Sequence, residues 1–225
     1  MASALAYERP SLQKSWEAFC AHLPTMASIW GLFILFTGLG IGLAWGIQSL
    51  SAALFGGGDD MMTLTSFLGQ VGQMPFTLVS NLVYILFFAI PAIFYQTGEA
   101  ITPEQAFAKL LNDPLRYLLA GALFSVVMTI GFLLCLLPGI AIGFVMPVYV
   151  NRIFLTRQSI PDAFASSFQA VYRSPHCWGF VGTQILVGLL VLLSAIGTCG
   201  LGLLVTVPMS SFYIQNAVYH KGILR

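Results

Sequence analysis

The chain has 225 residues, of which 58% are hydrophobic and 8% are charged, and its formal net charge is +1. A soluble domain carries about 25% charged residues, so this composition excludes a soluble globule and indicates an integral membrane protein in contact with the lipid bilayer. The near-neutral charge balance also argues against nucleic acid as a partner.

Long stretches without a charged residue or histidine predict the membrane spans. Residues 117–151 form one such stretch. As a single helix it would be about 52 Å long, whereas a bilayer core is about 30 Å thick. We therefore expect two spans that reverse at Pro138 and Gly139, because Pro-Gly is a turn signal. The same reasoning along the chain predicts six spans, at about 25–49, 75–96, 116–136, 138–155, 177–196 and 199–219.

Short amphipathic segments precede the spans at three places. They are "SLQKSWEAFCAH" (11–22), "TPEQAFAKLLN" (102–112) and "SIPDAFASSFQAVYRS" (159–174). In the second segment, Thr102 is the expected N-cap and Gln105 completes a capping box. We expect each segment to form a helix that lies flat at the cytoplasmic interface, with its aromatic side chains toward lipid or the bundle.

The spacing of the prolines indicates a threefold internal repeat. Pro114 and Pro147 are 33 residues apart, as are Pro175 and Pro208. The fold class predicted is thus an all-α membrane bundle of six helices in three hairpins, each preceded by a short amphipathic helix. The repeat units would be 11–96, 101–155 and 159–220 of a single membrane domain, 1–225, with an extramembrane excursion at about 51–74. The prolines expected to kink or hinge the second span of each unit are Pro91, Pro147 and Pro208.

The distribution of basic residues predicts the orientation in the membrane. With six spans, all nine Lys and Arg residues fall on the side that holds both termini, and the opposite loops contain none. This is a strong positive-inside pattern. We expect both termini to be cytoplasmic, in a bacterial plasma (inner) membrane or a thylakoid membrane.

Two short motifs carry a resemblance to a known group of proteins. They are "LLCLLPGI" (133–140) and "DAFASSFQAVYRSPHCWGF" (162–180). With the six-span layout, the chain resembles uncharacterised bacterial membrane proteins of the YciC-like family and the membrane domain attached to some glycerophosphodiester phosphodiesterases. The resemblance implies a membrane domain and does not imply an activity.

No catalytic, metal or cofactor site is expected. All acidic residues and histidines lie in predicted loops or at span ends, and no HExxH, GxSxG or P-loop motif occurs. His22, His176 and His220 have no metal-ligand spacing. An enzyme would need an acid–base cluster at the cytoplasmic face, for example His176 with Asp113.

Two cysteines and two amides are weaker candidates for a function. Cys135 and Cys199 both lie beside predicted outer-face turns. They would form a disulfide if the hairpins adjoin in an oxidising compartment, and otherwise they are small packing residues. Asn81 and Gln184 are the best candidates for lining a polar path through the bundle. The alternative for both amides is a hydrogen bond between helices.

Glycines recur every four residues in two of the spans. Such small-residue ridges let helix backbones approach closely, within the chain or against another subunit. The ridge residues are Gly38, Gly42 and Gly46 in the first span, and Gly139 and Gly143 in the fourth.

These features favour a non-enzymatic multi-pass membrane protein that acts as a scaffold, assembly factor or accessory subunit of a membrane complex. Its partners would be lipid and other membrane-protein subunits. The alternative is a transporter or channel for a small apolar or amphipathic solute, because repeats with proline-broken helices are compatible with moving bundles. The lack of buried charge expected in the bundle argues against coupling to protons or ions.

Overall fold

The computed structural model describes residues 2–55 and 59–224, with side chains for 2–54 and 63–224. The protein is all-helical, with 84% of its residues in helices and no strand in the part described. This confirms the all-α class. Two compact units are present, one of Met1–Met26 with Ile85–Arg225 and one of Ala27–Tyr84. We refer to them as the large unit and the hairpin unit.

Among the described residues, five helical segments are long and apolar enough to cross a membrane. They are Leu23–Leu54, Thr63–Thr97, Pro114–Leu134, Leu136–Leu155 and Cys177–Gly197. These segments make the chain a candidate multi-pass membrane protein. The sixth expected span, 199–219, is not among them. It corresponds to helix α11 (Leu203–His220), whose polar residues include Gln215 and Asn216. The prediction of six spans in three repeats is therefore not confirmed.

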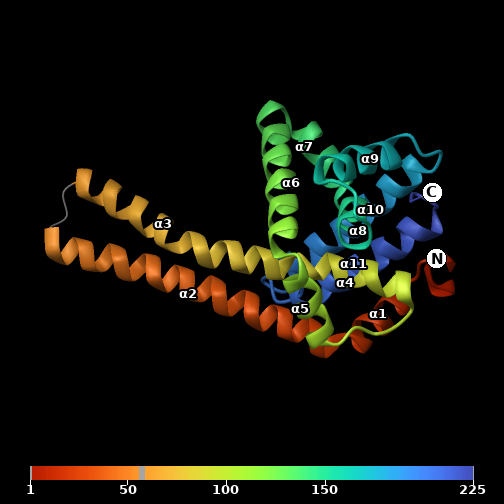
Figure 1. The fold of residues 1–225 in the computed structure, drawn as a ribbon, viewed down its shortest axis with the longest axis horizontal. Helices are drawn as coiled ribbons and strands as arrows, with labels where there is room; N and C mark the ends of the chain where they lie inside the picture. Colours follow the sequence, from red (N-terminus) through yellow and green to blue (C-terminus); the bar gives the residue numbers. More distant parts are fainter. Residues whose placement is uncertain (1, 56–58, 225) are drawn as a thin grey trace. The chain divides into compact units, whose positions relative to one another are not determined.

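The hairpin unit contains most of α2 (Leu23–Phe55) and α3 (Asp59–Tyr84), which run side by side in Figure 1. Helix α2 has 33 residues and is about 50 Å long, because no charge or proline interrupts it after Pro24. Residues 59–74, part of the predicted excursion, are helical and belong to α3. A Cβ added at Gly40 would lie 3.0 Å from Cβ of Phe76, so the two helices approach closely there.

In the large unit, α6 (Pro114–Leu134) and α7 (Leu136–Gly143) form a second hairpin. The chain reverses at Cys135, whose backbone is extended, and not at Pro138 and Gly139 as expected. Pro138 instead lies in the first turn of α7, where its missing N–H costs no hydrogen bond. Gly131 and Gly139 face each other across this hairpin: a Cβ added at Gly131 would lie 3.1 Å from Cα of Gly139.

Three helices form the centre of the large unit. Helix α4 (Leu86–Thr97) packs against α8 (Met146–Leu155) and α11, and α8 and α11 also touch each other. Helix α10 (Cys177–Gly197) packs on α11, and α9 (Ile160–Tyr172) packs on α8. The core is apolar, with fully buried rings of Phe87, Phe180 and Phe212. The close packing of such side chains stabilises the large unit through many van der Waals contacts.

The three prolines expected to act as hinges are buried within these central helices. Pro91 and Pro208 lie inside α4 and α11, and neither helix is interrupted at its proline. Pro147 lies in the first turn of α8, directly after a break at Phe144 and Val145 that separates α7 from α8. A structural interruption thus accompanies only one of the three.

The short amphipathic segments are helical. They form α1 (Leu12–Ala21), α5 (Pro103–Asn112) and α9, and a 3-10 turn, η1 (Ala4–Tyr7), precedes α1. The capping box of α5 is confirmed: Thr102 Oγ1 accepts from the Gln105 N–H, and the Gln105 side chain accepts from the Thr102 N–H.

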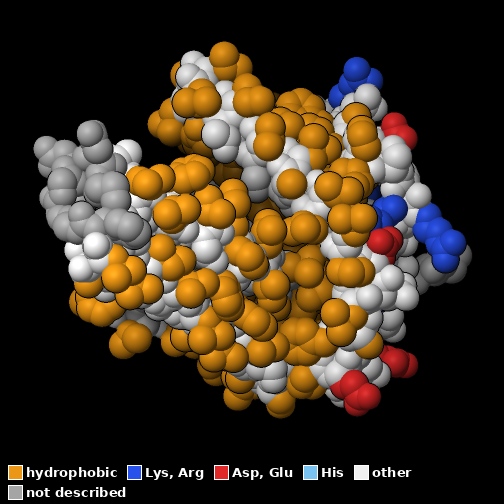
Figure 2. All heavy atoms as spheres, turned by 60° about the vertical axis from the view of Figure 1, so that its left-hand side comes forward, with side chains coloured by type: hydrophobic (Ala, Val, Ile, Leu, Met, Phe, Trp, Pro, Cys, Tyr) orange, Lys and Arg blue, Asp and Glu red, His pale blue; other side chains and the backbone are white. Residues whose placement is uncertain are grey.

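The charged side chains that the structure describes all belong to the large unit. On the face shown in Figure 2, the blue and red side chains gather along one edge, and the remaining surface is mostly hydrophobic. Exposed leucines, isoleucines, valines and tryptophans account for much of this apolar surface. An apolar surface of this kind is expected for a protein in contact with a lipid bilayer.

Candidate functional site

A buried network of amides joins α8 to α11. Asn151 Nδ2 donates to the Tyr219 hydroxyl at 2.9 Å and to Gln215 Oε1 at 3.4 Å. Gln215 Nε2 donates in turn to the carbonyl oxygen of Pro147 at 2.8 Å. All four residues are buried. These polar groups satisfy one another, so the network fixes the register between the two helices.

The break between α7 and α8 leaves backbone carbonyls that side chains of other helices cover. Gln184 Nε2 of α10 donates to the carbonyl oxygen of Phe144 at 2.9 Å. The Tyr172 hydroxyl of α9 donates to the carbonyl oxygen of Ala141 at 2.6 Å. Gln184, a candidate for a polar path, thus has a structural partner. Asn81, the other candidate, is exposed and belongs to the hairpin unit.

The N-terminal segment lies against the C-terminal end of α11. Asn216 Nδ2 donates to the carbonyl oxygen of Ala6 at 3.0 Å, and His220 Nδ1 lies 3.0 Å from the carbonyl oxygen of Tyr7. Ser3 Oγ donates to the carbonyl oxygen of Tyr95, near the end of α4, at 2.7 Å. Both ends of the chain are therefore held at one end of the large unit.

His22, at the end of α1, is fully buried against the rings of Phe94 and Phe212. Its Nε2 accepts a hydrogen bond from the Ile101 N–H at 3.1 Å. Its Nδ1 must therefore carry the proton that is donated to the Ala18 carbonyl oxygen at 2.7 Å. This arrangement requires the neutral ring. Burial lowers the pKa of His22 below its ordinary 6.5, against a smaller opposing effect of the Ala18 hydrogen bond.

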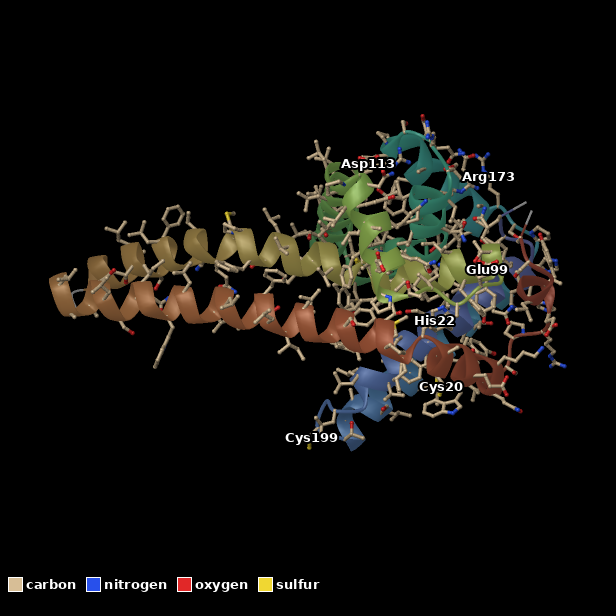
Figure 3. All side chains as sticks on the ribbon, turned by 60° about the horizontal axis from the view of Figure 1, so that its bottom comes forward. Cys20, His22, Glu99, Asp113, Arg173 and Cys199 are labelled. Carbon is tan, nitrogen blue, oxygen red and sulfur yellow. The ribbon has the colours of Figure 1, made fainter. Side chains whose placement is uncertain are left out.

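The most distinctive site is a cavity of about 620 Å³ on the large unit, which we call the basic cavity. Helix α8 supplies Arg152, helix α9 and its C-cap supply Gln169 and Arg173, and the loop before α10 supplies His176. Lys221 follows α11 directly, and Arg173 is labelled in Figure 3. The complete lining is Arg152, Ser166, Gln169, Ala170, Arg173, Ser174, Pro175, His176, Lys221, Gly222 and Ile223.

The electrostatics of the basic cavity are one-sided. Its lining, all within the described part of the chain, holds two arginines, a lysine and a histidine but no Asp or Glu. The one ion pair among the described side chains joins Lys14 to Glu8, outside this cavity. Arg152 Nε is buried and has no hydrogen-bond partner among the described atoms. The cavity therefore offers several cationic donors without a counter-charge from the described protein.

Sequence reasoning did not find this site. It interpreted the basic residues only as markers of membrane orientation, and Asp113, the suggested acid partner of His176, does not line the cavity. The cavity combines residues from α8, the α9–α10 connection and the chain after α11. A signal was present, because Arg152 lies inside the expected span 138–155, where an arginine is unfavourable unless it has a role.

The predicted glycine ridges have different surroundings. No described atom lies within 4 Å of a Cβ added at Gly38, Gly42 or Gly46, so the other described residues of the hairpin unit leave the α2 ridge open. The α2–α3 contact instead uses glycines that the sequence analysis did not select, namely Gly40, Gly69 and Gly72. In the large unit, Gly139 lies directly against the Phe132 ring, and Gly143 makes an ordinary contact with Met128.

The four cysteines are free thiols, with Cys20, Cys135 and Cys199 exposed and Cys177 buried. Cys199 lies in the turn between α10 and α11 (Figure 3). The bridge between Cys135 and Cys199 stays a prediction. Within the residues that the structure describes, no group of three His, Cys, Asp or Glu side chains could hold a metal ion.

Comparison with known proteins found no matching family model, no matching curated protein and no matching solved structure. The resemblance to the YciC-like group therefore remains a prediction from the motifs at 133–140 and 162–180. Proposals on function rest on the chain's own residues.

Proposed function

We propose that this protein is a non-enzymatic multi-pass membrane protein, an accessory or assembly subunit that binds a transmembrane helix of a partner protein. The observation that carries the proposal is the open glycine ridge of α2. No described atom lies within 4 Å of a Cβ added at Gly38, Gly42 or Gly46, although the same helix is closely packed within the hairpin unit through Gly40 on another face.

The surroundings of the ridge support a helix as the occupant. Leu35, Leu39 and Trp45 flank the glycines and are exposed, with Trp45 73% exposed. Large apolar side chains beside a glycine groove fit a helix that packs closely within the bilayer. Lipid chains alone do not require a groove of this kind, because they adapt to any apolar surface.

The substitution that tests the proposal is Gly42→Leu, which fills the groove without touching the α2–α3 contact. We expect this variant to fold normally but to lose its partner during purification in mild detergent, as measured by mass spectrometry of the bound proteins. Gly40→Leu is the contrasting variant, because its side chain collides with Phe76 and should destabilise the hairpin itself.

Gly188→Leu is the matched control, because Gly188 lies in α10, also has no described neighbour within 4 Å, and belongs to no glycine ridge. It should leave both stability and binding unchanged. If Gly42→Leu retains the same bound proteins as the wild type and Gly188→Leu, the ridge does not dock a partner and the proposal is wrong.

We also propose that α11 is a sixth span and that both termini lie on the cytoplasmic side. The contacts of Asn216 and His220 with the N-terminal segment support this, because a chain whose two ends lie together must cross the membrane an even number of times. The low hydropathy of α11 has a structural explanation. Gln215 and Asn216 are buried and bonded within the unit, away from lipid.

The order of elements supports three hairpin repeats. Short helices α1, α5 and α9 each precede a long apolar helix, namely α2, α6 and α10. Each long helix is followed by a second one that ends in α4, α8 or α11, and these three second members pack together. Solute transport receives less support, because Gln184 already bonds the Phe144 carbonyl and is 8% exposed.

A further inference from the structure

We propose that the basic cavity binds an anion that carries a phosphate group, held by Arg152, Arg173, His176 and Lys221. This inference goes beyond the proposed docking of a partner helix and does not depend on it. It rests on the charge of the lining, on the buried guanidinium nitrogen of Arg152, and on the size and position of the cavity.

The lining selects for negative charge. It contains two arginines, a lysine and a histidine, and the described residues of the lining include no carboxylate that would compete for them. Arginine and lysine at one site are the usual donors to phosphate oxygens, because guanidinium N–H groups match two oxygens at once and the ammonium adds a mobile charge. Ser166, Gln169 and Ser174 add neutral polar groups that complete the recognition of a polar ligand.

The side chain of Arg152 supports an anionic occupant. Arg152 lies near the end of the candidate span Leu136–Leu155. Its Nε is buried and has no hydrogen-bond partner among the described atoms. A buried donor that is part of a cationic group is costly when unpaired. Arg152 also lines a second cavity of about 280 Å³, and its described lining again contains no Asp or Glu. The described residues of both linings therefore supply no counter-ion for this guanidinium, and an external anion would provide one.

The position of the cavity adds to its positive potential. His176, the N-cap residue of α10, forms part of the lining and makes no side-chain capping bond. The 21-residue helix α10 thus begins at the cavity, where the partial positive charge of a helix N-terminus favours an anion. The ammonium group of Lys221 lies close to the first turn of α10, because a Cβ added at Gly179 would be 3.0 Å from Lys221 Nζ.

The volume favours a ligand larger than a single inorganic ion. A cavity of about 620 Å³ falls within the range of about 300–1,000 Å³ that is typical of small-molecule sites. A phosphate monoester such as a glycerol phosphate is of suitable size. The same chemistry occurs in a phospholipid headgroup and in a soluble phosphate ester, so the experiment must separate the two sources.

The test uses the full chain, stripped of lipid in mild detergent, and two matched pairs of probes. Phosphatidic acid and diacylglycerol differ by the phosphate alone, and so do glycerol 1-phosphate and glycerol. Binding of the lipids is measured by native mass spectrometry, and binding of the soluble pair by calorimetry. We expect binding of phosphatidic acid, glycerol 1-phosphate or both, and no binding of the probes without phosphate.

The double variant Arg173→Gln/Lys221→Gln should weaken binding of the phosphate probe by about tenfold or more, because it removes two charged donors. Lys109→Gln/Arg157→Gln is the matched control: it changes the net charge equally, at two exposed residues outside the cavity. The single variants Arg173→Gln and Lys221→Gln carry the same test, with smaller losses, if the double variant does not fold.

Each outcome decides the matter. If the protein binds phosphatidic acid but not glycerol 1-phosphate, the ligand is a lipid headgroup. If it binds glycerol 1-phosphate and the cavity variants weaken that binding, the ligand is a soluble phosphate ester. The proposal is overturned if the cavity and control variants weaken binding equally, since attraction would then come from the overall charge. It is also overturned if the wild type binds neither phosphate probe.

Discussion

The buried ring of His22 should make the stability of the protein depend on pH. The unfolded chain takes up a proton at the ordinary pKa of about 6.5, whereas burial lowers the pKa of His22 in the folded state. Protonation would also place a hydrogen on Nε2, which now accepts a hydrogen bond from the Ile101 N–H. Two donors would then face each other, and this hydrogen bond would be lost. Stability is thus complete above about pH 6.5 and is lost as the pH falls below it. The midpoint temperature of thermal unfolding should decrease when the pH is lowered from about 7.5 to about 5.5.

Two variants assign this pH dependence to one ring. His22→Gln keeps a donor and an acceptor but cannot titrate, so its unfolding midpoint should change much less over the same pH range. His176→Gln alters an exposed histidine and should retain the wild-type dependence. An unchanged pH profile in His22→Gln would show that other groups cause the effect.

At the scale of elements, Arg116 of α6 binds the chain directly after α8. Its Nη2 donates to the carbonyl oxygens of Thr156 at 3.0 Å and Gln158 at 2.8 Å, just beyond the last turn of α8. A cation at a helix C-terminus also interacts favourably with the helix dipole. We expect Arg116→Ala to lower the free energy of unfolding by about 1–3 kcal/mol, measured by denaturation in mixed micelles.

Arg116→Lys should recover only part of this loss, because the flexible lysine side chain is less well fixed in the position that Nη2 occupies. Arg157→Ala removes an exposed arginine of the adjacent loop and should have little effect on stability. If the alanine variants of Arg116 and Arg157 are equally stable, the capping contacts of Arg116 contribute nothing measurable.

Element boundaries were predictable where a charge or a proline limits the helix. The expected spans 116–136 and 177–196 correspond closely to α6 and α10. The reversal at Cys135 was misplaced because proline is tolerated in the first turn of a helix as well as in a turn, and the sequence does not distinguish these two uses.

The faces of the helices were harder to predict than their limits. The period-four pattern selected Gly38, Gly42 and Gly46, whereas the hairpin contact uses Gly40 and Gly69. On a helix that is apolar all round, composition does not indicate which side meets a neighbour. The basic cavity was missed for a related reason: its residues are distant in sequence, and only folding brings α8, α9 and the chain after α11 together.

At the scale of the whole molecule, the central question is how many times the chain crosses the membrane. Hydropathy supports five spans, since α11 is too polar to be counted. The hydrogen bonds from α11 to the N-terminal segment support an even number. The two views agree if α11 crosses with Gln215 and Asn216 turned inward, because a bonded amide inside a bundle avoids the cost of contact with lipid.

Cysteine labelling in cells with an impermeant maleimide can decide between five and six crossings. Single-cysteine variants that retain Cys135 or Cys199 should react in intact cells, because both exposed thiols lie at turns on the outer face of the proposed layout. A variant that retains Cys20, and one with Leu224→Cys as its sole cysteine, should react only after permeabilisation. The buried Cys177 is the control and should react only on denaturation.

Labelling of Leu224→Cys in intact cells, with Cys20 still protected, would place the ends on opposite sides. That result would contradict the crossing of α11 and the docking of the N-terminal segment on it, because Asn216 and Ala6 could not then meet.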